Sequence, residues 1–252
     1  MKIKDILQKL NHLAPETLAE EWDNVGLMLG SVDNECSGIV VTLDLTKDVA
    51  MRAVDNGCNL IVTHHPFIFH AIDRIDLATA KGELIAYLLK NGITVYSAHT
   101  NLDKAEGGVC WELANMLGGI NLKLDGIGIY FDIEKASLKK FAKRVADVLG
   151  DRSVKMIGDA DKSIQRVYLV SGSGADTESY LRAKQCADVF VTGEMKHHFY
   201  IDACEDDFPL IEYSHFHSEI VVENIFSRLF ADCGVKIIKG NQKCPFRILE
   251  EL

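Results

Sequence analysis

The chain has 252 residues, of which 48% are hydrophobic and 25% are charged. This composition is ordinary for a globular protein and argues against a disordered chain, and the length suffices for one large domain or two small ones. The formal net charge is −10 at pH 7. This charge argues against nucleic acid as a partner, because a surface that follows phosphates needs clustered Lys and Arg.

The N-terminal segment MKIKDILQKL is typical of an amphipathic helix and not of a cleaved signal peptide. No apolar run approaches the roughly 20 residues that cross a bilayer, so we expect a cytoplasmic protein with no membrane partner. The 7 cysteines are scattered and are never spaced as Cys-x-x-Cys. Neither a disulfide framework nor a thiolate zinc site is therefore predicted.

Two stretches of the chain carry the same order of predicted elements. The first consists of strands at 39–43 and 59–63 around a helix at 47–56, followed by a strand at 93–97. The second consists of strands at 168–171 and 188–192 around a helix at 176–185, followed by a strand at 209–213. A duplicated βαβ unit predicts an α/β fold of two related lobes, whose mostly parallel or mixed sheets are flanked by helices.

We place the first lobe at residues 1–125 and the second at 126–252, with the C-terminal segment packing back on the first lobe. Two further stretches, 133–149 and 218–230, have the apolar spacing of amphipathic helices that pack against a core.

Histidines and carboxylates follow the predicted strands. Pro66 ends the second strand, after His64 and His65, and consecutive imidazoles point to opposite sides of an extended chain. A single buried histidine is more often a hydrogen-bonded core residue than a ligand. However, the third strand of each stretch is also followed by His-x-x-x-carboxylate. Because ligands of open α/β sheets lie beyond the carboxyl ends of strands, two lobes that face each other would form a metal site between them.

The carboxylates of this pattern are Asp103 and Glu219, which could bridge two cations and offset their charge. The alternative is helix capping, since Asp103 and Ser218 could each begin a helix. Imidazole and carboxylate ligands without thiolate suit Zn, Fe, Mn, Co or Ni, and the sequence does not choose among these metals.

Other residues allow two interpretations. His99, His197 and His198 are candidates for proton transfer or for orienting a ligand, and a structural role fits each equally well. The Gly172–Gly174 loop could bind an anion at a helix N-terminus or form a plain tight turn. Trp22 with the turn-forming residues after it is typical of a packed helix exit.

Six motifs occur in one order along nearly the whole chain: EEWDNVGLMLG, VTHHPFIF, YSAHTNLDKAEGGV, SGSGAD, VTGEMKHH and SHFHSE. With them the chain resembles the NGG-interacting-factor-three-like proteins, also known as GTP cyclohydrolase I type 2 homologues, in the short form without the inserted domain. It departs from the family pattern at Ser214, Cys110 and Cys244, none of which is a ligand position.

This resemblance implies two intertwined α/β repeats, a toroidal homohexamer and a dinuclear metal site. It also implies a site-edge or subunit-interface role for the Trp22 segment. Matched residue by residue, the ligands are His64, His65, Asp103, His215 and Glu219. Five ligands exceed the three or four of a single zinc site, so we expect two divalent metal ions per chain.

Two functions remain open on the sequence. The first is a metal-dependent hydrolase. Its reaction would be a ring opening like that of GTP cyclohydrolase type 2, or a related hydrolysis of a nucleotide or other small molecule. His99 or His198 would move protons in this reaction. The second is a non-catalytic metal-binding, storage or metallochaperone protein. A closed coordination shell would favour the second function, because catalytic sites keep an open position.

Overall fold

The protein divides into two units in a computed structural model that describes residues 1–248. The first unit consists of residues 1–108 and 222–243, and the second consists of residues 109–221 with the stretch that begins at Cys244. The division expected from the sequence lay at residue 125. After the sheet of the second unit is complete, residues 222–243 belong to the first unit again.

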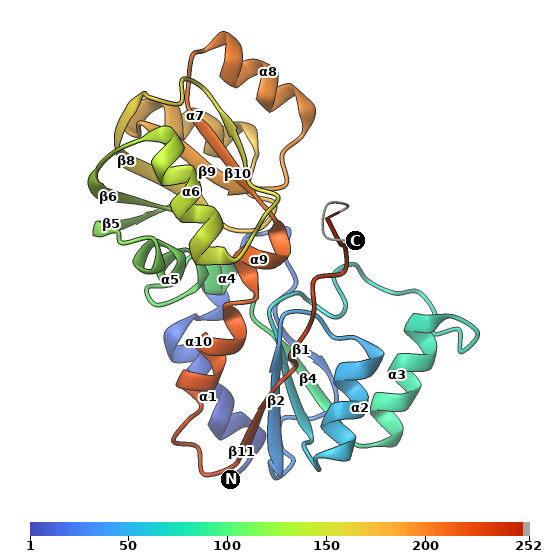
Figure 1. The fold of residues 1–252 in the computed structure, drawn as a ribbon. Coiled ribbons are helices and arrows are strands. Elements are labelled where there is room, and N and C mark those ends of the chain that lie inside the picture. The colour runs from blue at the N-terminus through green and yellow to red at the C-terminus, as the bar shows by residue number, and fades with distance from the viewer. Residues whose placement is uncertain (249–252) are drawn as a thin grey trace. The chain divides into compact units, whose positions relative to one another are not determined.

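The first unit is an α/β sheet with helices on both faces (Figure 1). Its elements are α1 (Ile3–Leu13), η1 (Glu16–Leu18), β1 (Gly26–Leu29), β2 (Gly38–Thr42), α2 (Lys47–Asp55), β3 (Leu60–Thr63), α3 (Ala80–Lys90), β4 (Thr94–Ser97), α4 (Thr100–Asp103), α10 (Val222–Leu229) and β11 (Lys236–Lys239). Within the described residues the sheet has the order β1-β4-β3-β2-β11. The strands from β4 to β11 run parallel, and β1 pairs antiparallel with β4.

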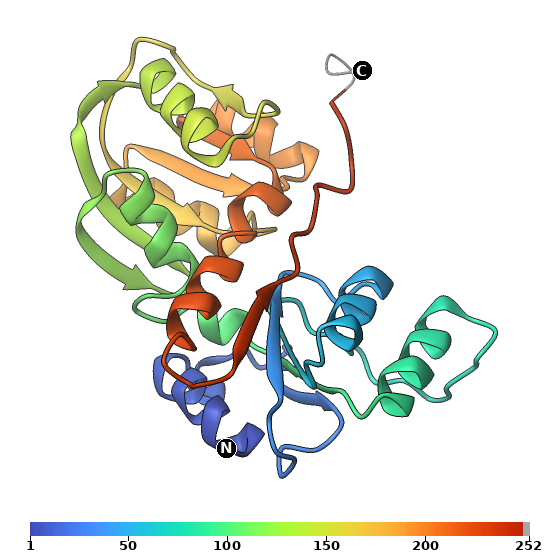
Figure 2. The same ribbon diagram turned by 60° about the horizontal axis from the view of Figure 1, so that its bottom comes forward.

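Burial on both faces explains why the inner strands β2 and β3 are nearly continuous apolar runs. Val40, Ile61 and Val95 pack in one core with residues of α2 and α3. Their neighbours along the strands, such as Ile39 and Val41, are equally buried and point to the opposite face. That face is covered by α1 and α10, as both views show (Figures 1 and 2).

The second unit repeats this architecture. Its elements are α5 (Val109–Met116), β5 (Ile120–Asp125), β6 (Gly128–Ser137), α6 (Leu138–Leu149), β7 (Lys155–Ile157), β8 (Ser163–Val170), α7 (Thr177–Cys186), β9 (Val189–Gly193), α8 (His197–Glu205), β10 (Leu210–Tyr213) and α9 (His215–Glu219). The order is β5-β6-β8-β9-β10-β7, with β8, β9 and β10 parallel. Tyr168, Phe190 and Leu210 of these strands form a core with α7 and α8.

The predicted fold class is confirmed. The series β2-α2-β3-α3-β4 and β8-α7-β9-α8-β10 have the same order and the same parallel pairing. In each unit the third strand is followed within two residues by a short helix, α4 after His99 and α9 from His215. In the part of the chain that the structure describes, no helix has both the length and the apolar character needed to cross a membrane.

The helix predicted at residues 133–149 is wrong in its first part. Ile129, Phe131 and Ile133 are buried in alternation along β6, which is the two-residue period of a strand. The helix begins only at Leu138, where the Ser137 side chain accepts a hydrogen bond from Lys140 N. The helix predicted at 218–230 is likewise divided into α9 and α10.

Two glycines at strand ends make room for the site of the second unit. Gly172 follows β8 with φ +56°, and a Cβ placed on it would overlap the Glu219 carboxylate. Gly193 ends β9, and a Cβ there would overlap the carbonyl oxygen of Gly172. The N-terminus of α7 is capped by Asp176, which accepts from Ser179 N at 2.6 Å. The Gly172–Gly174 loop is therefore a tight turn that allows the close approach of Glu219.

We predict that Gly172→Ala destabilises the protein more than Gly150→Ala. Both glycines have a left-handed backbone, at φ +56° and +65°, but a Cβ at Gly150 would meet nothing within 4 Å. Each substitution should cost about 1–2 kcal/mol for the backbone, and Gly172→Ala should add about 1–3 kcal/mol for overpacking against Glu219. Urea unfolding followed by circular dichroism measures both, and equal losses would contradict the proposed role of Gly172.

Candidate metal centre

Backbone hydrogen bonds fix His64 and His65 at the end of β3. His64 N donates to Thr42 O at 3.2 Å, and His65 N donates to Leu43 O at 3.0 Å, so the parallel ladder continues past the strand. Thr63 Oγ1 lies 2.7 Å from Ser97 Oγ of β4 and 2.8 Å from His65 O. The two imidazoles therefore stand on a hydrogen-bonded strand end and not on a free loop.

The turn of helix after β4 brings a carboxylate to His64. Asp103 N donates to His99 O at 3.1 Å, which closes one turn of α4. Asp103 is buried, with 4% of its surface exposed, and its Oδ1 lies 3.6 Å from Nε2 of the fully buried His64. Asn101 Nδ2 donates to Ala14 O at 2.8 Å and so anchors α4 to the chain after α1.

His64, His65 and His99 form a group of imidazoles that could hold a metal ion. Each offers a ring nitrogen within 4.8 Å of the others. Their ring centroids are 5.1–5.7 Å apart. We call these three residues, with Asp103, the histidine cluster.

Each imidazole of the histidine cluster has its Nδ1 against an oxygen that only accepts hydrogen bonds. The distances are 2.8 Å from His64 to Ala98 O, 2.7 Å from His65 to Asp44 Oδ1 and 2.9 Å from His99 to Asp23 Oδ1. Nδ1 must therefore carry the hydrogen, which leaves the lone pair of each ring on Nε2. Histidines that bind metals have this arrangement, in which the outer acceptor fixes the tautomer and the ring orientation.

Asp23 is the most constrained of these acceptors. Its side chain is fully buried, and it accepts from His99 Nδ1, from Thr100 N at 3.1 Å and from Thr100 Oγ1 at 2.5 Å. Burial by itself would raise the pKa of the Asp23 carboxyl, but the hydrogen bonds from His99 and Thr100 lower it to about 2. Asp23 is thus ionised at neutral pH and holds the His99 ring in one orientation.

Asp44, the acceptor for His65, is positioned by the chain that follows β11. Asp44 N donates to Gln242 Oε1 at 2.8 Å, and Thr42 Oγ1 donates to the same atom at 2.7 Å. Gly240 N donates to Val41 O at 2.8 Å. A side chain some two hundred positions along the sequence therefore sets the turn that carries the partner of His65.

The second unit carries a His–carboxylate pair on one turn of α9. His215 Nε2 lies 2.7 Å from Glu219 Oε2, at the i, i+4 spacing of one helix face. His215 Nδ1 lies 3.0 Å from Glu194 Oε2. Ser218 Oγ accepts from Gly172 N and donates to His215 O, so the pair is tied to the turn after β8. His215 thus has the same oxygen contact at Nδ1 as the histidine cluster.

Sequence reasoning missed the residues that orient the ligands: Asp23, Asp44, Glu194 and Gln242. Asp44 directly follows a predicted strand and Glu194 follows another after one glycine, at the carboxyl edge where site residues gather, and that position could have revealed them. Asp23 lies in the Trp22-Asp23-Asn24 motif. No local signal marks Gln242.

His197 and His198 lie on the exposed side of α8. The His198 ring centroid is 4.2 Å from that of Phe199, and His198 lines a pocket of about 280 Å³ between α7 and α8 with Tyr180 and Lys184. Among residues 1–248, the groups with metal-binding geometry include neither histidine. A catalytic role for His198 stays a prediction.

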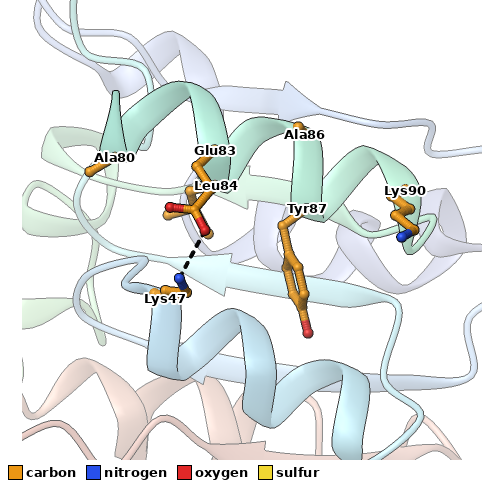
Figure 3. Close-up of a pocket in the computed structure, with 7 residues that line it drawn as sticks. All are labelled: Lys47, Ala80, Glu83, Leu84, Ala86, Tyr87 and Lys90. Carbon is orange, nitrogen blue, oxygen red and sulfur yellow. Dashed lines mark hydrogen bonds and ion pairs between the residues drawn. The ribbon is translucent and has the colours of Figure 1, made fainter. Parts of the chain in front are cut away.

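A second pocket of about 360 Å³ lies along α3 in the first unit (Figure 3). Tyr87 points from α3 toward α2, and Lys47 forms a 2.9 Å ion pair with Glu83. The lining combines alanine, leucine and tyrosine side chains with charged ones and contains no residue of the histidine cluster. None of its residues belongs to the groups with metal-binding geometry among residues 1–248, so the histidine cluster and the His215–Glu219 pair remain the better candidates for chemistry.

Known proteins resemble this chain over nearly its full length. A protein of Clostridium acetobutylicum named GTP cyclohydrolase 1 type 2 homolog is 34% identical over 87% of this chain and 85% of its own. A Helicobacter pylori protein named GTP cyclohydrolase 1 type 2 is 31% identical over 98% of this chain and 99% of its own.

Solved structures agree with the fold. Staphylococcus aureus protein SA1388 has a TM-score of 0.90 at 27% identity, with 99% of both chains covered. Reduced HcgD from Methanocaldococcus jannaschii has a TM-score of 0.85 at 27% identity, covering 96% of this chain and 98% of its own. The family model described as Duf34/NIF3 (NGG1p interacting factor 3) matches residues 1–245, and the chain therefore belongs to this family.

Proposed function

We propose that the protein binds two divalent metal ions through His64, His65, Asp103, His215 and Glu219, and that it is a metal-dependent hydrolase. One observation carries the proposal: each histidine of this set has its Nδ1 held by an oxygen atom. A neutral imidazole fixed in this way keeps the Nε2 lone pair that a metal needs.

The donor set fits divalent transition metals. It combines imidazole nitrogen with buried carboxylate oxygen, since Asp103 and Glu219 are both nearly inaccessible to solvent. Buried carboxylates are costly unless a cation or hydrogen bonds compensate their charge. Zn, Fe, Mn, Co and Ni all accept such ligands.

Paired divalent ions supply a bound water of lowered pKa and polarise a carbonyl, imine or phosphoryl group. The chain supplies the proton handling. His99 lies in the histidine cluster with its Nδ1 held by the ionised Asp23, so its Nε2 keeps the lone pair that a proton-transfer group needs. The Glu219 side chain is held near His215 by the glycine turn after β8.

The names of relatives point to the reaction class. The Helicobacter pylori relative is named GTP cyclohydrolase 1 type 2, so the substrate we propose is GTP or another nucleotide or small molecule whose ring or ester is opened by water. A metal store or metallochaperone would use the same ligands, and the activity of variants separates the two.

We predict that Glu219→Gln and His198→Gln differ in metal content. If Glu219 bridges both ions, as the motif implies, loss of its charge should remove both ions together, because two adjacent cations need that negative charge. His198→Gln should keep two ions per chain, because His198 lies outside the groups with metal-binding geometry. Elemental analysis after metal-replete expression measures both.

The same variants test the hydrolase. Both should lose activity on a panel of nucleotides and phosphoesters if His198 moves protons, whereas wild type with no activity on any of them supports metal storage. If Glu219→Gln retains both ions, its bridging role is wrong. One ion or none in the wild type would contradict the dinuclear site.

We predict that Asp44→Asn weakens metal binding by about 10-fold, because loss of an outer carboxylate that holds a ligating histidine typically costs 10–100-fold in affinity. Asn still accepts from His65 Nδ1 but removes the charge. The control is Asp33→Asn, an exposed aspartate paired with Lys4. Competition with a chromophoric chelator measures affinity, and equal values for the two variants would show that Asp44 does not act on the metal.

We propose that the chain assembles as a homohexamer, which is the assembly that the family resemblance implies. Light scattering at micromolar concentration should give six times the 28.0 kDa of one chain. A single species with the mass of one chain would contradict this proposal.

A further inference from the structure

We propose that Trp22 and Phe69 form an aromatic wall that holds a planar heteroaromatic ring of the substrate beside the histidine cluster. This inference rests on the proposed function, because it assigns the substrate contacts of the same site. The wall lies wholly within the first unit.

Both rings are exposed and both border the histidine cluster. Trp22 is 60% exposed and Phe69 is 38% exposed, and their ring centroids are 6.1 Å apart. The His99 ring lies 6.3 Å from Trp22 and 6.2 Å from Phe69, edge-on to both. His99 in turn is 5.1 Å from His64. The aromatic surface therefore continues directly into the imidazoles.

Hydrogen bonds hold the two segments that carry the wall. Asp23, next to Trp22, is fixed by His99 and Thr100. Asn24, the following residue, donates through Nδ2 to Ile68 O at 2.5 Å and so ties the Trp22 segment to the Phe69 segment. One tripeptide thus orients His99, joins the two segments and presents an indole to solvent.

A pre-positioned aromatic pair fits a planar π ring better than it fits other substrates. Leaving an indole and a phenyl ring in water is unfavourable, and stacking with a flat ring recovers that apolar surface without requiring particular hydrogen bonds. An acyclic phosphoester has no face to offer. A ring held against Trp22 or Phe69 would lie beside His99, one imidazole away from His64, near the place where the proposed function has water activated.

The alternative occupant is a second copy of the chain. Ile72, Ile75 and Leu77 follow Phe69 and are also exposed, and an interface would use such a run of aliphatic side chains. The wall differs from that run because its neighbours are His99, His70 and the carboxylate of Asp23. These polar neighbours suit a small polar heterocycle, and the interface becomes an outcome of the test.

The test is calorimetric titration of the metal-loaded protein with guanosine and, as the probe without an aromatic ring, ribose. We expect guanosine to bind and ribose not to bind. Trp22→Ala should weaken guanosine binding at least 10-fold, and Trp22→Phe should restore most of it. Leu77→Ala, which removes a side chain that is 64% exposed in the same region, should leave guanosine binding unchanged.

Two controls keep the outcomes separate. Fluorescence of Trp22 in a Trp111→Phe background should be quenched saturably by guanosine and not by ribose. Metal content is measured on every variant, so absence of metal counts against the proposed function and not against the wall. Equal guanosine affinity in wild type and Trp22→Ala overturns the wall. Loss of the assembly in both Trp22→Ala and Leu77→Ala, with guanosine binding intact, also overturns it and assigns the surface to an interface.

Discussion

The site depends on one kind of interaction, a hydrogen bond from a histidine Nδ1 to an oxygen that cannot donate. It recurs at His64, His65 and His99, and His215 has the matching contact with Glu194. The acceptors differ: one is a backbone carbonyl and the others are carboxylates. What they share is the effect on the ring, because each fixes the tautomer and aims Nε2 away from the supporting oxygen.

Parallel strands bring the residues that make these contacts to one edge of the sheet. Each parallel ladder ends at the same edge of its sheet, so the residues after β2, β3 and β4 emerge together, and Asp44, His64 and His99 are residues of that edge. The hydroxyl pair of Thr63 and Ser97 and the bonds to Thr42 O and Leu43 O keep the edge rigid. Precision at the imidazoles thus comes from the sheet, whose residues are buried on both faces, and not from the loops that carry them.

The strand pattern and the candidate ligands could be predicted from sequence, because both depend on the spacing of residues that are close together along the chain. Continuous runs such as residues 39–43 indicate strands buried on both faces, and the histidines follow them directly. The orienting partners could not be predicted in this way. Gln242 reaches Asp44 only because β11 returns to pair with β2, and Asp23 meets His99 only in the folded chain. The misassigned start of α6 has another cause. Ile133 fits both the two-residue period of a strand and the apolar face of a helix, and in the folded chain β6 pairs with β8, so this segment is a strand.

The two units have the same scaffold but carry different side chains at their strand ends, so a duplicated fold has diverged in its candidate site residues. After β3 the first unit places two imidazoles, whereas after β9 the second unit places Glu194, which supports His215 instead of adding a further imidazole. The two units also make room for their carboxylates in different ways. The second unit needs Gly172 and Gly193 at its strand ends to admit Glu219, while the first brings Asp103 to His64 by one turn of α4. A histidine followed four residues later by a carboxylate is common to both, so the divergence lies in the neighbouring strand ends. Those strand ends determine whether a unit carries several imidazoles or one imidazole with two carboxylates around it.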